Sequence, residues 1–252
     1  MQSAPRTPFW LWPNVLSLDA PIVALVWQDF VARCYPSLLR PSGRCVLGLT
    51  VWAIYLADRL LDARHMAPSS SGGFYQRNWK ALGLLLAMVL VADAVFTTVW
   101  LRPAVLWTGL PLGLAVTAYL GVFSYGGLVA FRWKRYAAAL LFSAGVFLVA
   151  LTGFPHRWSA LMWPLLGFAL LCLCNLLAIV RLEGRRSPET SIWLWIAALG
   201  LAAFLSGNLP WTLALASSAL GLILLVWSGH ALPQPTGRVL ADAVLLTPIL
   251  FR

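Results

Sequence analysis

Apolar residues run through this sequence in long blocks, separated by short stretches rich in Pro, Gly, Ser and Arg. A helix that crosses a lipid bilayer needs about 20 mostly apolar residues. We predict nine such helices, the last of them short, at residues 15–33, 44–62, 81–100, 104–124, 135–154, 159–180, 190–206, 210–229 and 238–251. The pattern therefore predicts an all-α fold, a polytopic membrane helical bundle of about nine transmembrane helices that forms one integral domain over residues 1–252.

Composition agrees with a membrane-embedded chain. Hydrophobic residues make up 61% of the sequence and charged residues only 10%, whereas soluble domains are about half apolar and about a quarter charged. The net charge is +10, which in a soluble protein would suggest nucleic acid as a partner. In a membrane protein, Lys and Arg in the loops set orientation and contact anionic lipid, so we expect membrane lipid and no nucleic acid.

The positions of Lys and Arg predict an orientation. Twelve of the 18 basic residues fall with the N-terminal segment and with the loops after the second, fourth, sixth and eighth predicted helices, and six fall on the other side. Cytoplasmic loops carry the excess of basic residues in most membrane proteins. We therefore expect a multi-pass protein of an inner, cytoplasmic-type membrane, with its N-terminus in the cytoplasm.

Two carboxylates close the second predicted helix. Asp58 and Asp62 are four residues apart, so they share one helical face, with Tyr55 one turn further in. Two like charges in a low dielectric repel, and Mg²⁺ would resolve the conflict because it binds carboxylate oxygens and is often completed by substrate phosphate. The alternative is a local ion network with Arg59 and Arg64 near the membrane surface.

The same stretch, IYLADRLLD at residues 54–62, resembles the first aspartate motif of the UbiA-type membrane prenyltransferase superfamily, NDxxDxxxD. Asp58 and Asp62 match its last two aspartates, while Ile54 and Tyr55 replace its leading Asn and Asp. Three further stretches are similar to family landmarks in the same order: LDAPI at 18–22, the pair Lys134-Arg135, and RLEGRR at 181–186. Nine helices with these loops in the cytoplasm is also the family's architecture.

The resemblance implies a Mg²⁺-dependent transfer of an isoprenoid chain from a prenyl diphosphate to a lipophilic acceptor. It implies that Asp58 and Asp62 hold Mg²⁺ and act in catalysis, and that Lys134 and Arg135 bind phosphate. Tyr55, Trp52 and Asn175 would line the cavity that shields the reacting cation from water.

The second aspartate motif of the family is degraded in this chain. When its EGDR end is aligned with residues 183–186, the usual Asp positions fall on Ala178, Arg181 and Arg185. These residues cannot build a second Mg²⁺ site. Arg181, Arg185 and Arg186 could instead bind diphosphate directly, because guanidinium groups match phosphate oxygens. The alternative is that they belong to a basic cytoplasmic loop.

Two more carboxylates lie within apolar stretches. Asp93, deep in the third predicted helix, is expected to form a buried hydrogen bond to another helix. Asp242 follows Arg238 by four residues, which favours an ion pair within one helix, with a role in a cavity as the alternative.

Three functions therefore remain open. The first is a divergent UbiA-like prenyltransferase that uses Mg²⁺, an isoprenoid diphosphate and a lipophilic acceptor. The second is a non-catalytic relative that binds a lipid, a pigment or a membrane-protein partner, suggested by the degraded motif and the 14 Trp residues. The third is a small transporter, suggested by Asp93 and Asp242.

Overall fold

The computed structural model describes residues 12–35, 37–64, 73–125, 128–153, 158–184, 192–228 and 234–251, and within these ranges it contains helices and no strand. The helices are α1 (Trp12–Val15), α2 (Asp19–Cys34), α3 (Pro41–Ala63), α4 (Gly73–Arg77), α5 (Trp79–Trp100), α6 (Pro103–Tyr125), α7 (Leu128–Gly153), α8 (Trp158–Leu182), α9 (Ile192–Leu205), α10 (Leu209–Ser228), α11 (Gln234–Val244) and the short 3₁₀ helix η3 (Thr247–Phe251). The expectation of an all-α chain is confirmed for these residues.

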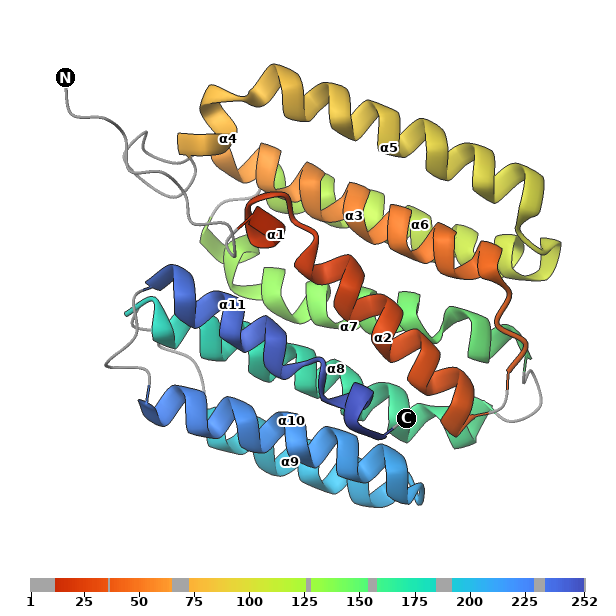
Figure 1. Ribbon diagram of the computed structural model, residues 1–252, viewed down its shortest axis with the longest axis vertical. Helices are drawn as coiled ribbons and strands as arrows, with labels where there is room; N and C mark the ends of the chain where they lie inside the picture. The colour runs from red at the N-terminus through yellow and green to blue at the C-terminus, as the bar shows by residue number, and fades with distance from the viewer. Residues whose placement is uncertain are drawn as a thin grey trace.

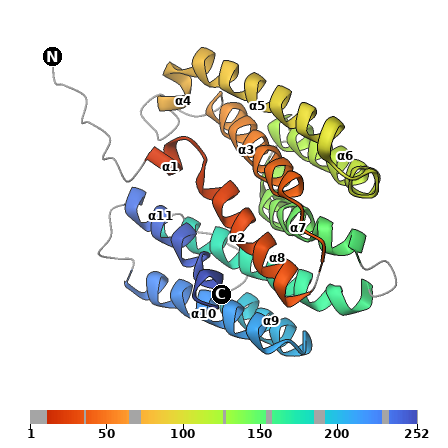
Figure 2. The ribbon, with the colours of Figure 1, turned by 45° about the vertical axis from the view of Figure 1, so that its right-hand side comes forward.

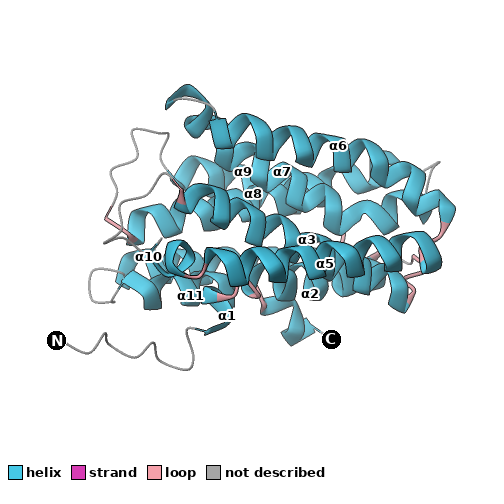
Figure 3. Ribbon diagram, turned by 90° about the horizontal axis from the view of Figure 1, so that it is seen from above, coloured by secondary structure: helices cyan, strands magenta, loops and turns pink. Residues whose placement is uncertain are grey.

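The long helices lie side by side in one bundle (Figure 1). Helices α5 and α6 lie at one side of the bundle, α9 and α10 at the other, and α2, α7, α8 and α11 between them, as the turned view in Figure 2 also shows. The view from above shows that the bundle is several helices deep (Figure 3). Helix α3 packs on α2, α5 and α6, while α8 packs on α7, α9, α10 and α11, so α3 and α8 belong to two halves that meet through α2 and α7.

The nine predicted segments overlap the helices α2, α3 and α5 to α11, and the last of them also covers η3. Five of these helices, α5, α6, α7, α8 and α10, contain a stretch long and apolar enough to cross a membrane. Such a set fits a multi-pass integral membrane protein. The predicted count of nine crossings is not confirmed, because α2, α9 and α11 have only 16, 14 and 11 residues and α3 ends in a charged stretch.

The interior is built from aromatic side chains where the two halves meet. Trp27 of α2 lies against Phe168 of α8, with ring centroids 4.6 Å apart, and against Trp211 of α10 at 5.3 Å. All three side chains are fully buried. The indole Nε1 of Trp27 donates a hydrogen bond of 2.8 Å to the carbonyl oxygen of Leu245, so the polar edge of this buried ring is satisfied.

The outer surface of the bundle is apolar. On α5 and α6, large hydrophobic side chains such as Leu84, Val91, Trp107 and Leu114 are exposed. Soluble monomers rarely expose so large a continuous apolar surface to water. In a membrane, such a surface contacts lipid tails, which are as apolar as the side chains. The exposed face therefore supports contact with the hydrocarbon core of a membrane.

Candidate functional site

The last two turns of α3 present Asp58 and Asp62 to the start of α7. The ammonium nitrogen of Lys134 lies 3.0 Å from Asp58 Oδ1, and 2.7 and 2.8 Å from Asp62 Oδ1 and Oδ2. The spacing of four residues does place both carboxylates on one face, as expected. The cation that joins them comes from another helix, while Arg59 also interacts electrostatically with Asp58. The ion network that the alternative predicts is therefore present, with Lys134 of α7 at its centre.

This cluster of Asp58, Asp62 and Lys134, here called the acid–lysine cluster, opens toward one side. The exposed fraction of the side chain rises from 14% for Lys134 to 29% for Asp58 and 43% for Asp62. Asp62 therefore faces water or headgroups at the end of the bundle, while Asp58 faces inward. The phenol of Tyr119, from α6, lies close to Asp58 and extends the polar surface toward the interior.

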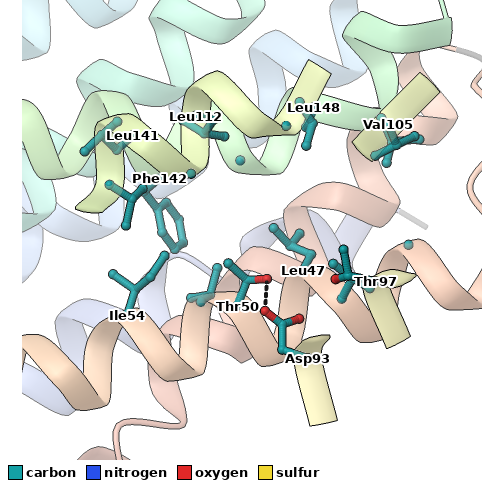
Figure 4. Close-up of a pocket in the computed structure, with 18 of the residues that line it drawn as sticks. Leu47, Thr50, Ile54, Asp93, Thr97, Val105, Leu112, Leu141, Phe142 and Leu148 are labelled. Carbon is teal, nitrogen blue, oxygen red and sulfur yellow. Dashed lines mark hydrogen bonds between the residues drawn. The ribbon is translucent and has the colours of Figure 1, made fainter. Parts of the chain in front are cut away.

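A cavity of about 390 Å³ begins at Asp58 and runs between α3, α5, α6 and α7. Its walls are mostly apolar, and Figure 4 shows Leu47, Ile54, Leu112, Leu141, Phe142, Leu148 and Val105 around the open space. The cavity extends along α3 from Asp58 to Gly43, 15 residues or about 22 Å at 1.5 Å per residue. Its shape therefore suits a long apolar chain with a polar group at the Asp58 end.

Polar side chains interrupt this wall at Gln28, Thr50, Asp93 and Thr97. Thr50 Oγ1 donates a hydrogen bond of 2.8 Å to Asp93 Oδ2, which joins α3 to α5 (Figure 4). The predicted interhelical hydrogen bond of Asp93 is thus confirmed. Because Asp93 lines the cavity, it also has a place in the site that the sequence did not indicate.

A second, smaller cavity lies beside this one. It measures about 60 Å³, and Tyr55, Ala138 and Phe142 line both cavities. Its polar lining is Asp19 from α2, Asn175 from α8 and Asp242 from α11. The polar residues of the site thus form two groups on either side of Tyr55.

The remaining predicted residues are distributed unevenly. Asn175 faces the smaller cavity and donates a hydrogen bond of 3.0 Å to Asp242 Oδ1, so it is not part of the acid–lysine cluster. Arg135 follows Lys134 on α7, is half-buried and lines neither cavity. Arg181 is exposed at the end of α8, and Arg185 lies outside the described residues. The expected arginine cluster opposite the carboxylates is therefore not shown.

One expectation needs correction, and another is met only in part. Trp52 lines neither cavity, and its indole Nε1 instead donates a hydrogen bond of 2.9 Å to the carbonyl oxygen of Leu16. Asp242 interacts electrostatically with Arg238, as expected, although the salt bridge of Arg238 is to Glu183, at 3.9 Å. Asp242 also accepts a hydrogen bond from Asn175 and lines the smaller cavity, so the cavity role applies as well.

The acid–lysine cluster supplies two carboxylates at one point, and in this structure Lys134 is their cation. Three carboxylate oxygens converge on Lys134 Nζ within 3.0 Å, so this ammonium marks a point where the chain accommodates a cation. Mg²⁺ is typically held by one or two carboxylates together with waters and substrate phosphate. Within the described residues no three His, Cys, Asp or Glu side chains gather as a metal site, so phosphate and water would supply the other ligands.

Comparison with known proteins does not assign a family. No protein-family model, no curated protein and no solved structure matches this chain.

Proposed function

We propose that this chain is a divergent UbiA-like membrane prenyltransferase, which transfers an isoprenoid chain from a prenyl diphosphate to a lipophilic acceptor with Mg²⁺. The observation that supports this most strongly is the position of the acid–lysine cluster at the end of the 390 Å³ apolar cavity. A ligand that fills both the cavity and the cluster must have a long hydrocarbon chain and, at one end, a polar group that binds a metal cation and the Lys134 ammonium group. A prenyl diphosphate has both features.

Each part of the donor has residues suited to it. The aliphatic walls on α3, α6 and α7 would hold the isoprenoid chain, and burial of such a chain contributes about 0.8 kcal/mol per CH₂ group. Asp58 and Asp62 would hold one Mg²⁺, which neutralises the charge of the diphosphate as it leaves. Lys134 would then donate to phosphate oxygens, since its ammonium group is a strong donor already placed at this point.

The proposed step is a substitution at the allylic carbon. The bond between this carbon and the diphosphate oxygen breaks, and the electron pair leaves with the diphosphate. A nucleophilic atom of the acceptor forms the new bond to the carbon and loses a proton. The aliphatic walls keep water away from the cation, and the tyrosines Tyr55 and Tyr119, both at the Asp58 end of the cavity, offer ring faces that stabilise it.

We further propose the membrane arrangement that this function needs. The helices α2, α3 and α5 to α11 would cross or enter an inner, cytoplasmic-type membrane, with the N-terminus and the Asp62 end of α3 in the cytoplasm. The excess of basic residues on that side supports this orientation. It would place the acid–lysine cluster where soluble Mg²⁺ and a diphosphate group are available.

A second function is favoured by one specific observation. Lys134 already balances part of the charge of Asp58 and Asp62, and the degraded second motif offers no further Mg²⁺ ligands at Ala178 and Arg181. These features suit a non-catalytic protein that binds a lipid or pigment in the same cavity. The two proposals differ in turnover and in their need for Mg²⁺, so one experiment separates them.

The test is thermal unfolding of the purified protein with Mg²⁺ and a panel of prenyl diphosphates of increasing chain length. A ligand that binds only the folded state raises the unfolding midpoint, so we expect a shift that needs both components. The double variant Asp58→Asn/Asp62→Asn should lose it. Asp29→Asn is the matched control, because Asp29 is also ion-paired, 2.6 Å from Arg44, but lies outside both cavities.

The outcomes decide between the proposals. A wild-type shift in the double variant, or an equal shift without Mg²⁺, would argue against a prenyltransferase. Transfer of a radiolabelled prenyl group into extracted membrane lipids by the wild type would support catalysis. Binding without transfer to any acceptor in the extract would favour the non-catalytic function.

The cavity itself can be tested by filling it. Gly113 lines the cavity on α6, and a Cβ atom there would meet no other atom within 4 Å. Gly113→Leu should therefore fold, but its side chain should occupy space that the isoprenoid chain needs. For the longest prenyl diphosphates, the concentration that gives half of the maximal rise in the unfolding midpoint should increase at least tenfold. Gly121→Leu is the control, since Gly121 has equally open surroundings on the same helix and lies outside the cavity.

A further inference from the structure

Four polar side chains from three helices line the middle of the larger cavity. Gln28 comes from α2, Thr50 from α3, and Asp93 and Thr97 from α5. Figure 4 shows Thr50, Asp93 and Thr97 together at one side of the open space, across from leucines of α6 and α7. These four residues are here called the polar belt.

The polar belt lies well away from the acid–lysine cluster. Thr50 precedes Asp58 by eight residues on α3, which is about 12 Å at 1.5 Å per residue. A Cβ atom at Gly48 of α3 would contact Leu25 of α2. Gln28 is almost one turn after Leu25 on α2, which runs opposite to α3 (Figure 1), so Gln28 lies further from Asp58 than Thr50 does. A ligand held at Asp58 therefore reaches the polar belt only through its chain.

Two oxygen atoms of the polar belt lack hydrogen-bond partners. Asp93 Oδ2 accepts a hydrogen bond of 2.8 Å from Thr50, but Asp93 Oδ1 is buried and has no partner among the described residues. Gln28 is only 3% exposed, and its Oε1 has no partner in the same part of the chain. Buried polar atoms without partners are costly, so these two oxygens indicate a ligand that forms hydrogen bonds here.

The surroundings favour a neutral group that can both donate and accept. Among the described residues no Lys, Arg or His lines the cavity, and no charged side chain acts on the Asp93 carboxyl group. A hydroxyl group suits Asp93 in either protonation state, because it donates to a carboxylate and accepts from a carboxylic acid. In both cases it is also a possible donor to Gln28 Oε1, whereas an ammonium group suits only the ionised form of Asp93.

We propose that the larger cavity binds an isoprenoid chain that carries a hydroxyl group about 12 Å or slightly further from its diphosphate, and that Asp93 and Gln28 bind this hydroxyl. The inference rests on the proposed function for the diphosphate end, and it specifies the class of substrate as a hydroxylated prenyl diphosphate. A plain hydrocarbon chain leaves both buried oxygens without partners, so the polar belt distinguishes the two kinds of chain.

Thermal unfolding with matched probes tests this inference. The ω-hydroxylated forms of dimethylallyl, geranyl and farnesyl diphosphate are each compared with the unhydroxylated parent in the presence of Mg²⁺, since a ligand of the folded state raises the unfolding midpoint. For the geranyl or farnesyl form, the hydroxyl should lower the half-maximal concentration about tenfold, as a hydrogen bond to a charged group does. The dimethylallyl form should gain nothing, because its hydroxyl stops short of the polar belt.

Geraniol and ω-hydroxygeraniol form a second pair, which lacks the diphosphate. A preference for ω-hydroxygeraniol without any response to the diphosphates would support the polar belt and contradict the proposed function. Diphosphates that raise the midpoint equally with and without the hydroxyl would support the proposed function and contradict the present inference. The double variant Asp58→Asn/Asp62→Asn should keep the preference for ω-hydroxygeraniol.

The variants Gln28→Leu and Asp93→Leu should each remove the preference for the hydroxylated probe. Both replace a side chain that has a buried oxygen without a partner, so both should fold. Thr98→Val is the matched control and should keep the preference. Its hydroxyl is also on α5, but it donates to the carbonyl oxygen of Ala94 in the same helix and lies outside the cavity.

Three results would overturn the inference. Equal half-maximal concentrations within every pair, or no response to any hydroxylated probe, would mean that water alone occupies the polar belt. A preference that persists in both leucine variants would place the hydroxyl elsewhere. A stronger response to ω-aminogeraniol than to ω-hydroxygeraniol, lost in Asp93→Leu, would identify the ligand group as an ammonium.

Discussion

At the scale of single residues, Lys134 controls the electrostatic state of the carboxylate pair. Its ammonium group contacts both Asp58 and Asp62 and is itself mostly buried. An ion pair in such a position adds little net stability when complete, because both partners lose hydration. The loss of one partner is more costly, since it leaves like charges facing each other.

We expect Lys134→Met to lower the free energy of unfolding by about 1–2 kcal/mol, a value reduced because Asp62 is 43% exposed and solvent screens its charge. The triple variant Asp58→Asn/Asp62→Asn/Lys134→Met should regain most of this loss. Chemical denaturation in a mild detergent measures both. Equal stability of Lys134→Met and wild type would mean that the cluster carries no net interaction.

At the scale of helices, a close contact between α10 and α11 positions Asp242. A Cβ atom added at Gly221 would lie 2.7 Å from Val244 Cγ1 and 3.2 Å from its Cγ2. Val is stiff at χ1, so it cannot turn away freely. The missing side chain at Gly221 therefore lets α11 lie close enough to α10 and α8 for Asp242 to meet Asn175.

Gly221→Ala should force α11 away from α10 and lower stability by about 1–3 kcal/mol, as overpacking does. The double variant Gly221→Ala/Val244→Ala should recover part of this loss because the obstructing methyl groups are gone. Gly200→Ala on α9 is the control, since its added Cβ meets no other atom within 4 Å. Thermal unfolding compares the three, and a neutral Gly221→Ala would show that α11 adjusts without strain.

At the scale of the whole molecule, the native cysteines report the proposed orientation. Cys45 is exposed near the start of α3, at the end opposite Asp62, whereas Cys172 and Cys174 are buried in α8. If the Asp62 end faces the cytoplasm, Cys45 faces the other side of the membrane. The distribution of basic residues and the proposed chemistry of the site both favour an orientation with the Asp62 end of α3 in the cytoplasm.

We expect a membrane-impermeant maleimide to label Cys45 in right-side-out vesicles, and Cys45→Ser to remove most of this label. In the Cys45→Ser background, Lys80→Cys introduces a thiol at an exposed position at the start of α5, which should react only in inverted vesicles. Labelling is read by mass spectrometry. The reverse pattern would place the acid–lysine cluster on the outer side and contradict the proposed access of Mg²⁺ and diphosphate.

Part of the site was predictable because it is local. Asp58 and Asp62 share a helical face whatever surrounds them, since their separation of four residues fixes it. The role of Asp19 was not predictable, because its neighbour Asp242 is more than 200 residues away in the chain and the two meet only where α2 packs on α11. The sequence shows Asp19 only as a carboxylate at the start of an apolar segment. A carboxylate in that position is also typical of a helix N-terminus, so it does not by itself indicate a site.

The sequence by itself determined where the helices run and that the chain belongs in a membrane. A helix satisfies its own backbone hydrogen bonds within one segment, so apolar blocks and their breaks are enough to place it. Only the tertiary structure decided that Lys134 bridges the two acids, that Tyr55 lines two cavities, and that Asp242 meets Asn175 and Asp19 as well as Arg238. These outcomes depend on which helices pack together. Helix surfaces of similar apolar composition interact equally well with lipid, so the sequence of one helix gives little information about its neighbouring helices.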